Sequence, residues 1–238
     1  MNLLNHLTNT FFRSLFQSCQ GNPLVMYFWD TKSLQPQYIL MLHKLQFLWH
    51  LVSLPETSLA KEVYNLQKGD KNLPSLVNEC ELHLEELDIH IDPASVTKKE
   101  WKKVITSKIH QKNKDSLLLQ IQSSRKLDIE TISSEDYEEK SYLRNMRISQ
   151  GRTFFSSRSS CLSTVQWNFK NNPKYRSNGY LCRCKEHIDT QSSLLNCRLY
   201  DHLKDGLDPS NSDIDLVRFF QLVIQERLKE EEDNDQSQ

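Results

Sequence analysis

The stretch YILMLHKLQFLWHLVSL, residues 38–54, is the longest apolar run of the chain and decides its fold class. Its apolar side chains recur every three or four residues, which is the period of an α-helix; the recurring positions are Ile39, Leu42, Leu45, Trp49 and Val52. Four polar residues make the run too polar and too short to cross a bilayer; they are His43, Lys44, Gln46 and His50. The run therefore predicts a helix that is buried on most sides.

Helix-start signals follow this run at two places. Ser53 and Glu56 have the spacing of a capping box, and the helix they would open has an apolar face made of Leu59, Val63 and Leu66. Thr97 and Glu100 have the same spacing, and the apolar residues that follow them are Trp101, Val104, Ile105 and Ile109. The lysines of this second helix fall largely outside its apolar face, where they either contact phosphate or form a solvated exterior; they are Lys98, Lys99, Lys102, Lys103 and Lys108.

The rest of the chain is expected to alternate between helices and irregular segments. A helix is expected at 73–87, with Cys80 as a small buried residue, and others around 115–122 and from 133 to about 150. Serine, asparagine and aromatic residues without a helical stripe predict loops and short extended pieces at 151–179. A last helix is expected from Asp213 to about Glu230. The expected fold class is mainly α: a helical bundle, then a small irregular Cys-containing subdomain and a C-terminal helix.

Four regions are expected along the chain. They are a helical region at 1–92, a basic helical region at 97–150, a basic aromatic loop region with the cysteine cluster and the last helix at 151–229, and an acidic tail at 230–238.

A segment of 46 residues, Lys140 to Lys185, contains no Asp or Glu but ten Lys or Arg and seven aromatic residues. The whole chain has a net charge of −1, so the remainder is acidic. Such a segment is typical of a surface that meets phosphates with cations and stacks aromatic rings on unpaired bases. The residues expected to do so are Arg144, Arg147, Arg152, Arg158, Lys170, Lys174, Arg176, Arg183, Trp167, Tyr175 and Tyr180. The alternatives are a basic solvated face and, for each aromatic residue, a place in the core.

Three of the six cysteines, Cys182, Cys184 and Cys197, lie within 16 residues of one another. A structural zinc site requires four ligands, so these three are one short; His187 is expected as the fourth, and His202 is the other candidate. The alternative is a set of free thiols in a small subdomain. The cysteines are too few and too widely spread for a disulfide scaffold, which favours an intracellular protein, nuclear or cytoplasmic, with reduced thiols.

Several classes of function are disfavoured by what the sequence lacks. With five glycines and no Gly-rich phosphate loop, nucleotide hydrolysis and dinucleotide binding are not expected. The first 19 residues lack the basic start and the cleavage site of a secretory signal, so the protein is not expected to be secreted. No pattern points to a thiol beside a base held by a third group, as Cys/His hydrolase chemistry needs. Neither a membrane nor a small-molecule substrate is expected as a partner.

A series of short motifs runs along the chain from about residue 7 to residue 228. The motifs are Tyr27–Thr31, Met41–Leu51, Leu54–Tyr64, Lys174–Ser177, Leu181–Cys184, Asp189–Gln191, Leu194–Leu195, Cys197–Tyr200 and Asp215–Ile224. In their order and spacing they resemble the C-terminal part of non-LTR (LINE-like) retrotransposon polyproteins, the part that follows the reverse-transcriptase palm.

The resemblance implies a helical region that ends in a small Cys/His subdomain, which helps to hold template or element RNA. It does not imply polymerase activity, because the Asp-Asp pair that holds the catalytic metals is absent from the sequence, as is the endonuclease part. In the family pattern a histidine stands four residues before the last cysteine, where this chain has Ser193. Metal ligation has therefore either moved to His187 or His202 or been lost.

The sequence thus predicts a non-catalytic module that binds RNA or single-stranded DNA, mainly through phosphates and with slight sequence preference. Zinc is the expected cofactor of the cysteine cluster. The alternatives are a helical module that docks a protein partner, such as a separate polymerase core, and a functionless remnant whose helices leave apolar faces uncovered.

Overall fold

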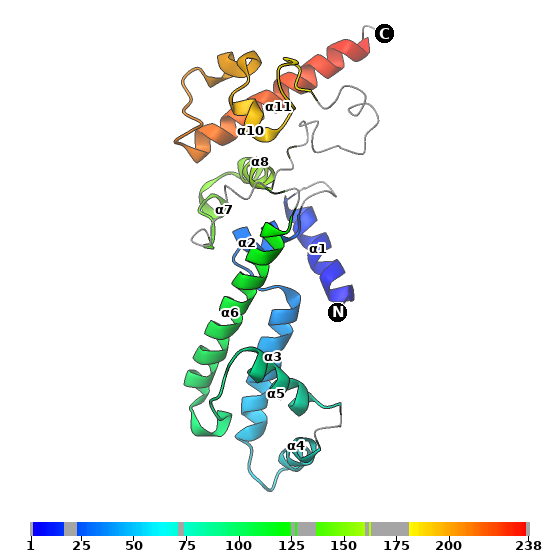
Figure 1. Ribbon diagram of the computed structural model, residues 1–238, viewed down its shortest axis with the longest axis vertical. Coiled ribbons are helices and arrows are strands. Elements are labelled where there is room, and N and C mark those ends of the chain that lie inside the picture. Colours follow the sequence, from blue (N-terminus) through cyan, green and yellow to red (C-terminus); the bar gives the residue numbers. More distant parts are fainter. Residues whose placement is uncertain are drawn as a thin grey trace. The chain divides into compact units, whose positions relative to one another are not determined.

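The computed structural model describes residues 2–16, 23–70, 74–124, 127, 137–159, 162 and 181–236. These residues form a mainly α-helical protein, as predicted, with a cysteine-containing region before a C-terminal helix (Figure 1). Outside the helices, a single isolated antiparallel bridge joins Leu181 and Ile188 within the described part of the chain. The contacts divide the protein into two units, one made of Met1–Thr8 and Lys32–Gln120 and the other of Asn9–Thr31 and Ile121–Gln238.

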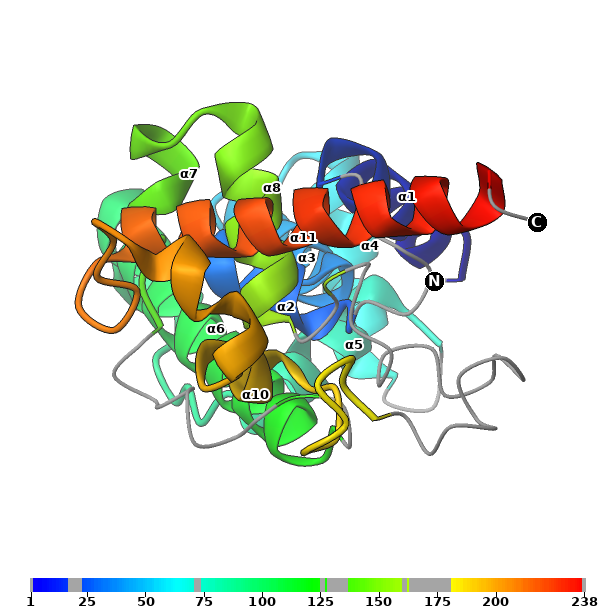
Figure 2. The same cartoon turned by 90° about the horizontal axis from the view of Figure 1, so that it is seen from above.

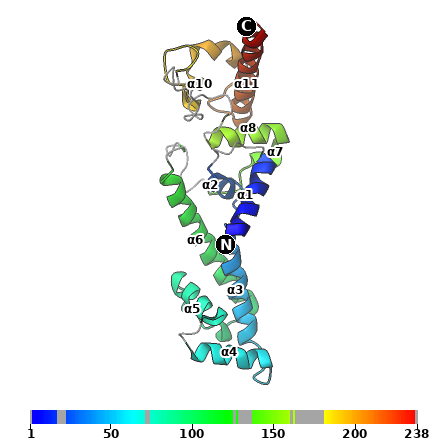
Figure 3. The ribbon, with the colours of Figure 1, turned by 90° about the vertical axis from the view of Figure 1, so that its right-hand side faces the viewer.

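The first unit is a small helical assembly around one long helix, α3 (Pro36–Val52). Against it pack α4 (Leu59–Gly69), α5 (Leu76–Glu86) and the short 3₁₀ turn η1 (Pro93–Ser95) (Figure 3). The basic helix α6 (Lys98–Gln122) joins them by a hydrogen bond of 2.9 Å from Trp101 Nε1 to the backbone oxygen of Leu45.

The buried side of α3 differs from the apolar stripe expected for it. The helix buries Tyr38, Met41, Leu45, Leu48 and Leu51, whereas Ile39 is 40% exposed. A helix that is apolar on nearly every side has no unique buried face, so its periodicity does not choose between neighbouring stripes. The choice is made by the helices that pack against α3.

The predicted start of the next helix at Ser53 was wrong. Ser53 closes α3, and α4 begins at Leu59, with the Ser58 hydroxyl accepting from the backbone N–H of Lys61 at 3.2 Å. Lys61 Nζ donates to the backbone oxygen of Val52 at 2.7 Å, which satisfies a carbonyl at the end of α3. This contact holds residues 53–58 as a turn instead of a helix.

Two further expectations for this unit are confirmed. Cys80 is fully buried on α5. The Thr97 backbone N–H donates to the Glu100 carboxylate at 3.0 Å, and the Glu100 N–H donates to the Thr97 hydroxyl at 3.3 Å, so the second capping box forms. Trp101 and Ile105 lie in the same core as α3, and for this reason α6 up to residue 120 belongs to the first unit. Residues 92 and 97 thus lie in the same unit, and the expected division into four regions stays a prediction.

The second unit contains the C-terminal half of α1 (Asn2–Phe16) together with α2 (Val25–Asp30), α7 (Tyr142–Asn145) and α8 (Ile148–Arg158). The loop expected from residue 151 was wrong at its start, because residues 151–158 belong to α8. The packing of Phe155 gives the reason for the helix at these residues. Its ring lies 4.7 Å from that of Tyr27 and 4.3 Å from that of Phe16, so one face of α8 is buried against α1 and α2.

The same unit ends in α10 (Gln191–Leu195), the 3₁₀ segment η5 (Arg198–Lys204) and the long helix α11 (Asp213–Gln236), against which η5 packs (Figure 2). A compact core joins these elements; its members include Cys182, Leu194, Cys197, Tyr200, Phe219, Phe220 and Val223. None of the helices in the described part of the chain has the length and apolar character needed to cross a membrane.

Candidate metal centre and basic segment

The cysteine cluster begins in a tight loop between Leu181 and Ile188, the two residues of the isolated bridge. The Cys182 N–H donates to the His187 carbonyl at 2.8 Å, and the Lys185 N–H donates to the Cys182 carbonyl at 2.7 Å. Lys185 takes a left-handed backbone conformation, with φ of 63°, which lets the chain reverse within the loop. The loop therefore brings residues 182, 184 and 187 onto one side of a short reversal.

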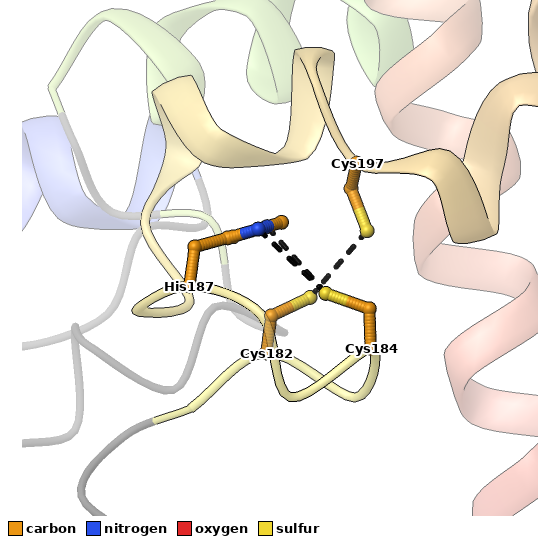
Figure 4. Close-up of side chains that lie close together, drawn as sticks. All are labelled: Cys182, Cys184, His187 and Cys197. Carbon is orange, nitrogen blue, oxygen red and sulfur yellow. Dashed lines mark hydrogen bonds between the residues drawn. The ribbon is translucent and has the colours of Figure 1, made fainter.

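Four side chains converge at this loop: Cys182, Cys184, His187 and Cys197 (Figure 4). Their ligand atoms all lie within 4.8 Å of one another. The Sγ atoms of Cys182 and Cys197 are 3.7 Å apart, and Cys184 Sγ lies 3.7 Å from His187 Nδ1. A tetrahedral zinc ion with Zn–S bonds of about 2.3 Å would separate its sulfur ligands by about 3.8 Å. The spacing of the donors thus fits a metal ion, whereas a disulfide would need the sulfurs about 2.0 Å apart.

The three sulfur atoms also accept backbone hydrogen bonds. Cys182 accepts from the amide of Cys184, Cys184 from the amides of Glu186 and His187, and Cys197 from the amide of Leu199. Amide hydrogens that point at sulfur favour the thiolate, which is the form that binds metal.

Burial acts in the opposite direction on the buried thiols. It raises the pKa of Cys182 to about 12 and raises that of Cys197 as well. Burial also acts to raise the pKa of Cys184, but hydrogen bonds to its sulfur, led by that from the Glu186 amide, outweigh it, and this pKa is lowered. Without a metal ion the cluster thus holds its protons on the buried sulfurs, and metal binding would displace them.

Cys197 follows α10, and this short helix positions it beside the other three side chains. The helix starts at Thr190, whose hydroxyl accepts from the Ser193 N–H at 3.2 Å, while the Ser193 hydroxyl accepts from the Thr190 N–H at 3.0 Å. The Ser193 hydroxyl also donates to the carbonyl of Ile188. Ser193 therefore caps α10, and His187 stands with the three cysteines. His202 lies elsewhere, with its Nε2 3.0 Å from the Glu226 carboxylate.

A buried ion pair that the sequence analysis missed lies beside the cluster. The Arg227 guanidinium on α11 donates to both Asp189 oxygens, at 2.8 and 2.9 Å, and its Nε donates to the Tyr200 hydroxyl at 2.8 Å. Its Nη2 lies 4.0 Å from the Cys182 sulfur. Burial opposes the charge on Arg227, but the hydrogen bonds and charge of Asp189 raise its pKa. The available sequence signal was an arginine in the register of the buried face of α11, four residues after Val223.

The structure places some of the predicted nucleic-acid contacts on the surface of the second unit. Arg144 and Arg147 are exposed; Arg144 pairs with Glu139 at 2.6 Å. Arg152 donates to the backbone oxygen of Leu15 at 3.1 Å. Lys170, Lys174, Arg176, Trp167, Tyr175 and Tyr180 lie outside the described residues, so their predicted role stays a prediction.

Two other arginines that were predicted to contact nucleic acid form hydrogen bonds within the protein. Arg158 donates to the buried carboxylate of Asp30 at 3.1 to 3.3 Å, and the Tyr142 hydroxyl donates to the same carboxylate at 2.9 Å. Arg183 donates from Nη2 to the backbone oxygen of Arg227 at 3.2 Å. Both arginines thus make contacts within the protein itself. The contact of Arg158 matters more for the fold, because its partner Asp30 is fully buried.

A set of three thiols and one imidazole is closed: it fills a tetrahedral coordination sphere and leaves no position for substrate. Such an arrangement stabilises a fold by joining the loop at 182–187 to the segment after α10. No protein-family model, curated protein or solved structure matches this chain.

Proposed function

We propose that this chain is a zinc-stabilised, non-catalytic module that binds RNA or single-stranded DNA. The observation that carries the proposal is the convergence of Cys182, Cys184, His187 and Cys197 at the end of a segment, residues 140–185, that contains ten cations and no carboxylate. A metal centre in this place would fix the end of the basic segment. Cations along the segment would then meet phosphates with little dependence on sequence.

The proposal includes an origin for the module. The order of its sequence motifs supports derivation from the C-terminal part of a non-LTR retrotransposon reverse transcriptase. In that case the ligand that the family pattern places at residue 193 has been replaced by His187. The Ser193 hydroxyl accepts from the Thr190 N–H and so completes the capping box of α10, which gives a serine a structural role at that position.

The metal part is tested by elemental analysis of the purified, reduced protein. We expect one zinc per chain, and none in a Cys182→Ser/Cys184→Ser variant. A well-folded wild-type protein without zinc would contradict the proposed metal centre.

The nucleic-acid part is tested by the anisotropy of a labelled single-stranded RNA at increasing salt. We expect affinity to fall steeply with salt, and Arg147→Gln/Arg152→Gln to reduce both the affinity and the slope. Arg198→Gln/Arg218→Gln is the matched control, since these arginines are exposed and belong to the same unit but lie outside the basic segment. Affinity that does not change between low and moderate salt would contradict the proposal.

A helical module that docks a protein partner is the second candidate, and one observation favours it. On α4 the side chains of Leu59, Val63 and Leu66 are 75%, 43% and 68% exposed and share one face of the helix. An exposed apolar stripe of this kind is typical of a docking surface. If this candidate holds, the protein will bind RNA weakly and without salt dependence, and Leu59→Gln/Leu66→Gln will abolish association with a polymerase core in sedimentation experiments.

A further inference from the structure

The first two turns of α6 carry a group of lysines that neither the metal centre nor the basic segment uses. We call this group the α6 lysine surface; its members are Lys98, Lys99, Lys102 and Lys103, all of them exposed. Within the described part of the chain none of the four forms an ion pair. By contrast, Lys108 and Lys112 of the same helix lie 3.6 and 3.5 Å from the carboxylates of Asp88 and Glu86.

The carboxylates nearest to the α6 lysine surface in the sequence are already engaged. Glu100 accepts from the backbone N–H and the hydroxyl of Thr97 in the capping box, at 3.0 and 2.7 Å. Asp92 accepts from the backbone N–H of Ala94 at 2.9 Å. The helix α3, against which this half of α6 packs through Trp101, contains no Asp or Glu. Glu100 and Asp92 keep their negative charge, but the four lysines outnumber them, so the surface is positive overall.

The position of these lysines adds to the positive potential. The first turn of a helix carries a partial positive charge, and acidic residues are favoured there. Here lysines occupy the first turn and the next one, at the positive end of a helix of 25 residues. Lys99 and Lys103 are four residues apart and so lie on one side of the helix, about 6 Å apart along its axis. A polymer with repeated negative charges would be attracted to such a row.

The apolar residues of the same turns indicate whether the α6 lysine surface suits a nucleic acid or a membrane. A helix that binds a bilayer surface presents exposed apolar side chains beside its lysines. In this part of α6 the large apolar residues Trp101 and Ile105 are fully buried in the core. The surface thus offers charge without side chains that could enter lipid.

We propose that the α6 lysine surface is a second contact for the phosphate backbone of nucleic acid, additional to the basic segment at 140–185. The inference rests on the proposed nucleic-acid function, which it extends to the first unit. Contacts from flexible ammonium groups to phosphate give affinity and salt dependence but no sequence preference.

The test compares two lysine pairs with the same spacing on the same helix in the full-length protein. Lys99→Gln/Lys103→Gln removes two members of the surface, and Lys108→Gln/Lys112→Gln removes two lysines that are paired with acids. The probe is a labelled single-stranded RNA, titrated at several salt concentrations. For two lost phosphate contacts, we expect the slope of log affinity against log salt to become shallower by about 1.4, and we expect no change for the control pair. Circular dichroism checks that both variants fold.

The outcomes separate this inference from the proposed function. If Arg147→Gln/Arg152→Gln weakens RNA binding but Lys99→Gln/Lys103→Gln keeps the wild-type slope, only the α6 lysine surface is refuted. Equal losses in the two lysine pairs would also refute it, since net charge alone would explain them. If the wild-type protein shows no salt-dependent binding, the proposed function and this inference fall together. Binding to vesicles of anionic lipid that is lost in Lys99→Gln/Lys103→Gln, with RNA binding unchanged, would assign the surface to a membrane.

Discussion

Replacing Asp189 with leucine should strongly destabilise the metal-centre region. The substitution removes a carboxylate that is fully buried and leaves the Arg227 guanidinium, itself only 2% exposed, without the two hydrogen bonds from Nη1 and Nη2. The Tyr200 hydroxyl accepts from Nε at 2.8 Å, and the Cys182 sulfur lies 4.0 Å from Nη2, but neither carries the charge of a carboxylate. Leaving one member of a buried ion pair uncompensated costs about 3–5 kcal/mol, so we expect a loss of unfolding free energy of that size.

The assay is urea unfolding of the reduced protein in excess zinc, followed by circular dichroism, with hydrogen exchange of residues 181–200 as a local measure. The matched control is Asp201→Asn, which breaks an exposed ion pair with Lys204 in the same unit and should cost less than about 1 kcal/mol. Asp189→Leu/Arg227→Met removes both charges and should recover most of the loss. The reasoning is refuted if Asp189→Leu costs no more than Asp201→Asn, or if the double variant is as unstable as the single one.

Three further predictions concern other parts of the protein. His187→Gln should lower the affinity for zinc, measured by competition with a chelator, and His202→Gln should leave it unchanged; the opposite order would mean that the fourth ligand has been misassigned. Burial raises the pKa of the Cys80 thiol from 9.0 to about 11, so the folded protein holds this proton more tightly than the unfolded chain. Its contribution to stability is complete below about pH 9 and lost as the pH rises toward 11. Between these two pH values the free energy of unfolding, measured with urea, should decrease less in Cys80→Ala than in the wild-type protein. An identical decrease in the two proteins would exclude this role for Cys80. Arg158→Gln should lower the unfolding free energy by about 3 kcal/mol or more, because it leaves the buried carboxylate of Asp30 without its cation, whereas the exposed Arg147→Gln should stay within about 0.5 kcal/mol in the same measurement.

Local signals in the sequence were reliable where one short segment controls the outcome. The capping box at Thr97 and Glu100 formed as expected, because its hydrogen bonds join residues only three positions apart. The box expected at Ser53 did not form, although its spacing is the same. There the side chain of Lys61 binds the carbonyl of Val52, and Ser58 becomes the cap of the next helix. Spacing alone cannot anticipate a contact that depends on how the following helix packs.

Apolar stripes were less reliable than helix positions. The stripe on α6 was correct, since Trp101, Ile105 and Ile109 are buried. The apolar face expected on α4 forms but is not covered: the buried residues of this helix are Lys61 and Tyr64, and the leucines at 59 and 66 are exposed. Periodicity identifies an apolar face, but the presence of a neighbouring element decides whether that face is covered.

The sequence by itself determined the mainly helical class, the positions of α3 and α11 and the three cysteines as metal-ligand candidates, because helical period and residue chemistry are local properties. The tertiary structure decided which histidine joins the cysteines. His187 was the expected fourth ligand and His202 the alternative. The hydrogen bonds that close the loop at 182–187 bring His187 to the thiols, while Glu226 on α11 pairs with His202. The ion pair of Asp189 and Arg227 was likewise decided only by folding, since residues 38 positions apart meet through the packing of α11 against the cysteine region.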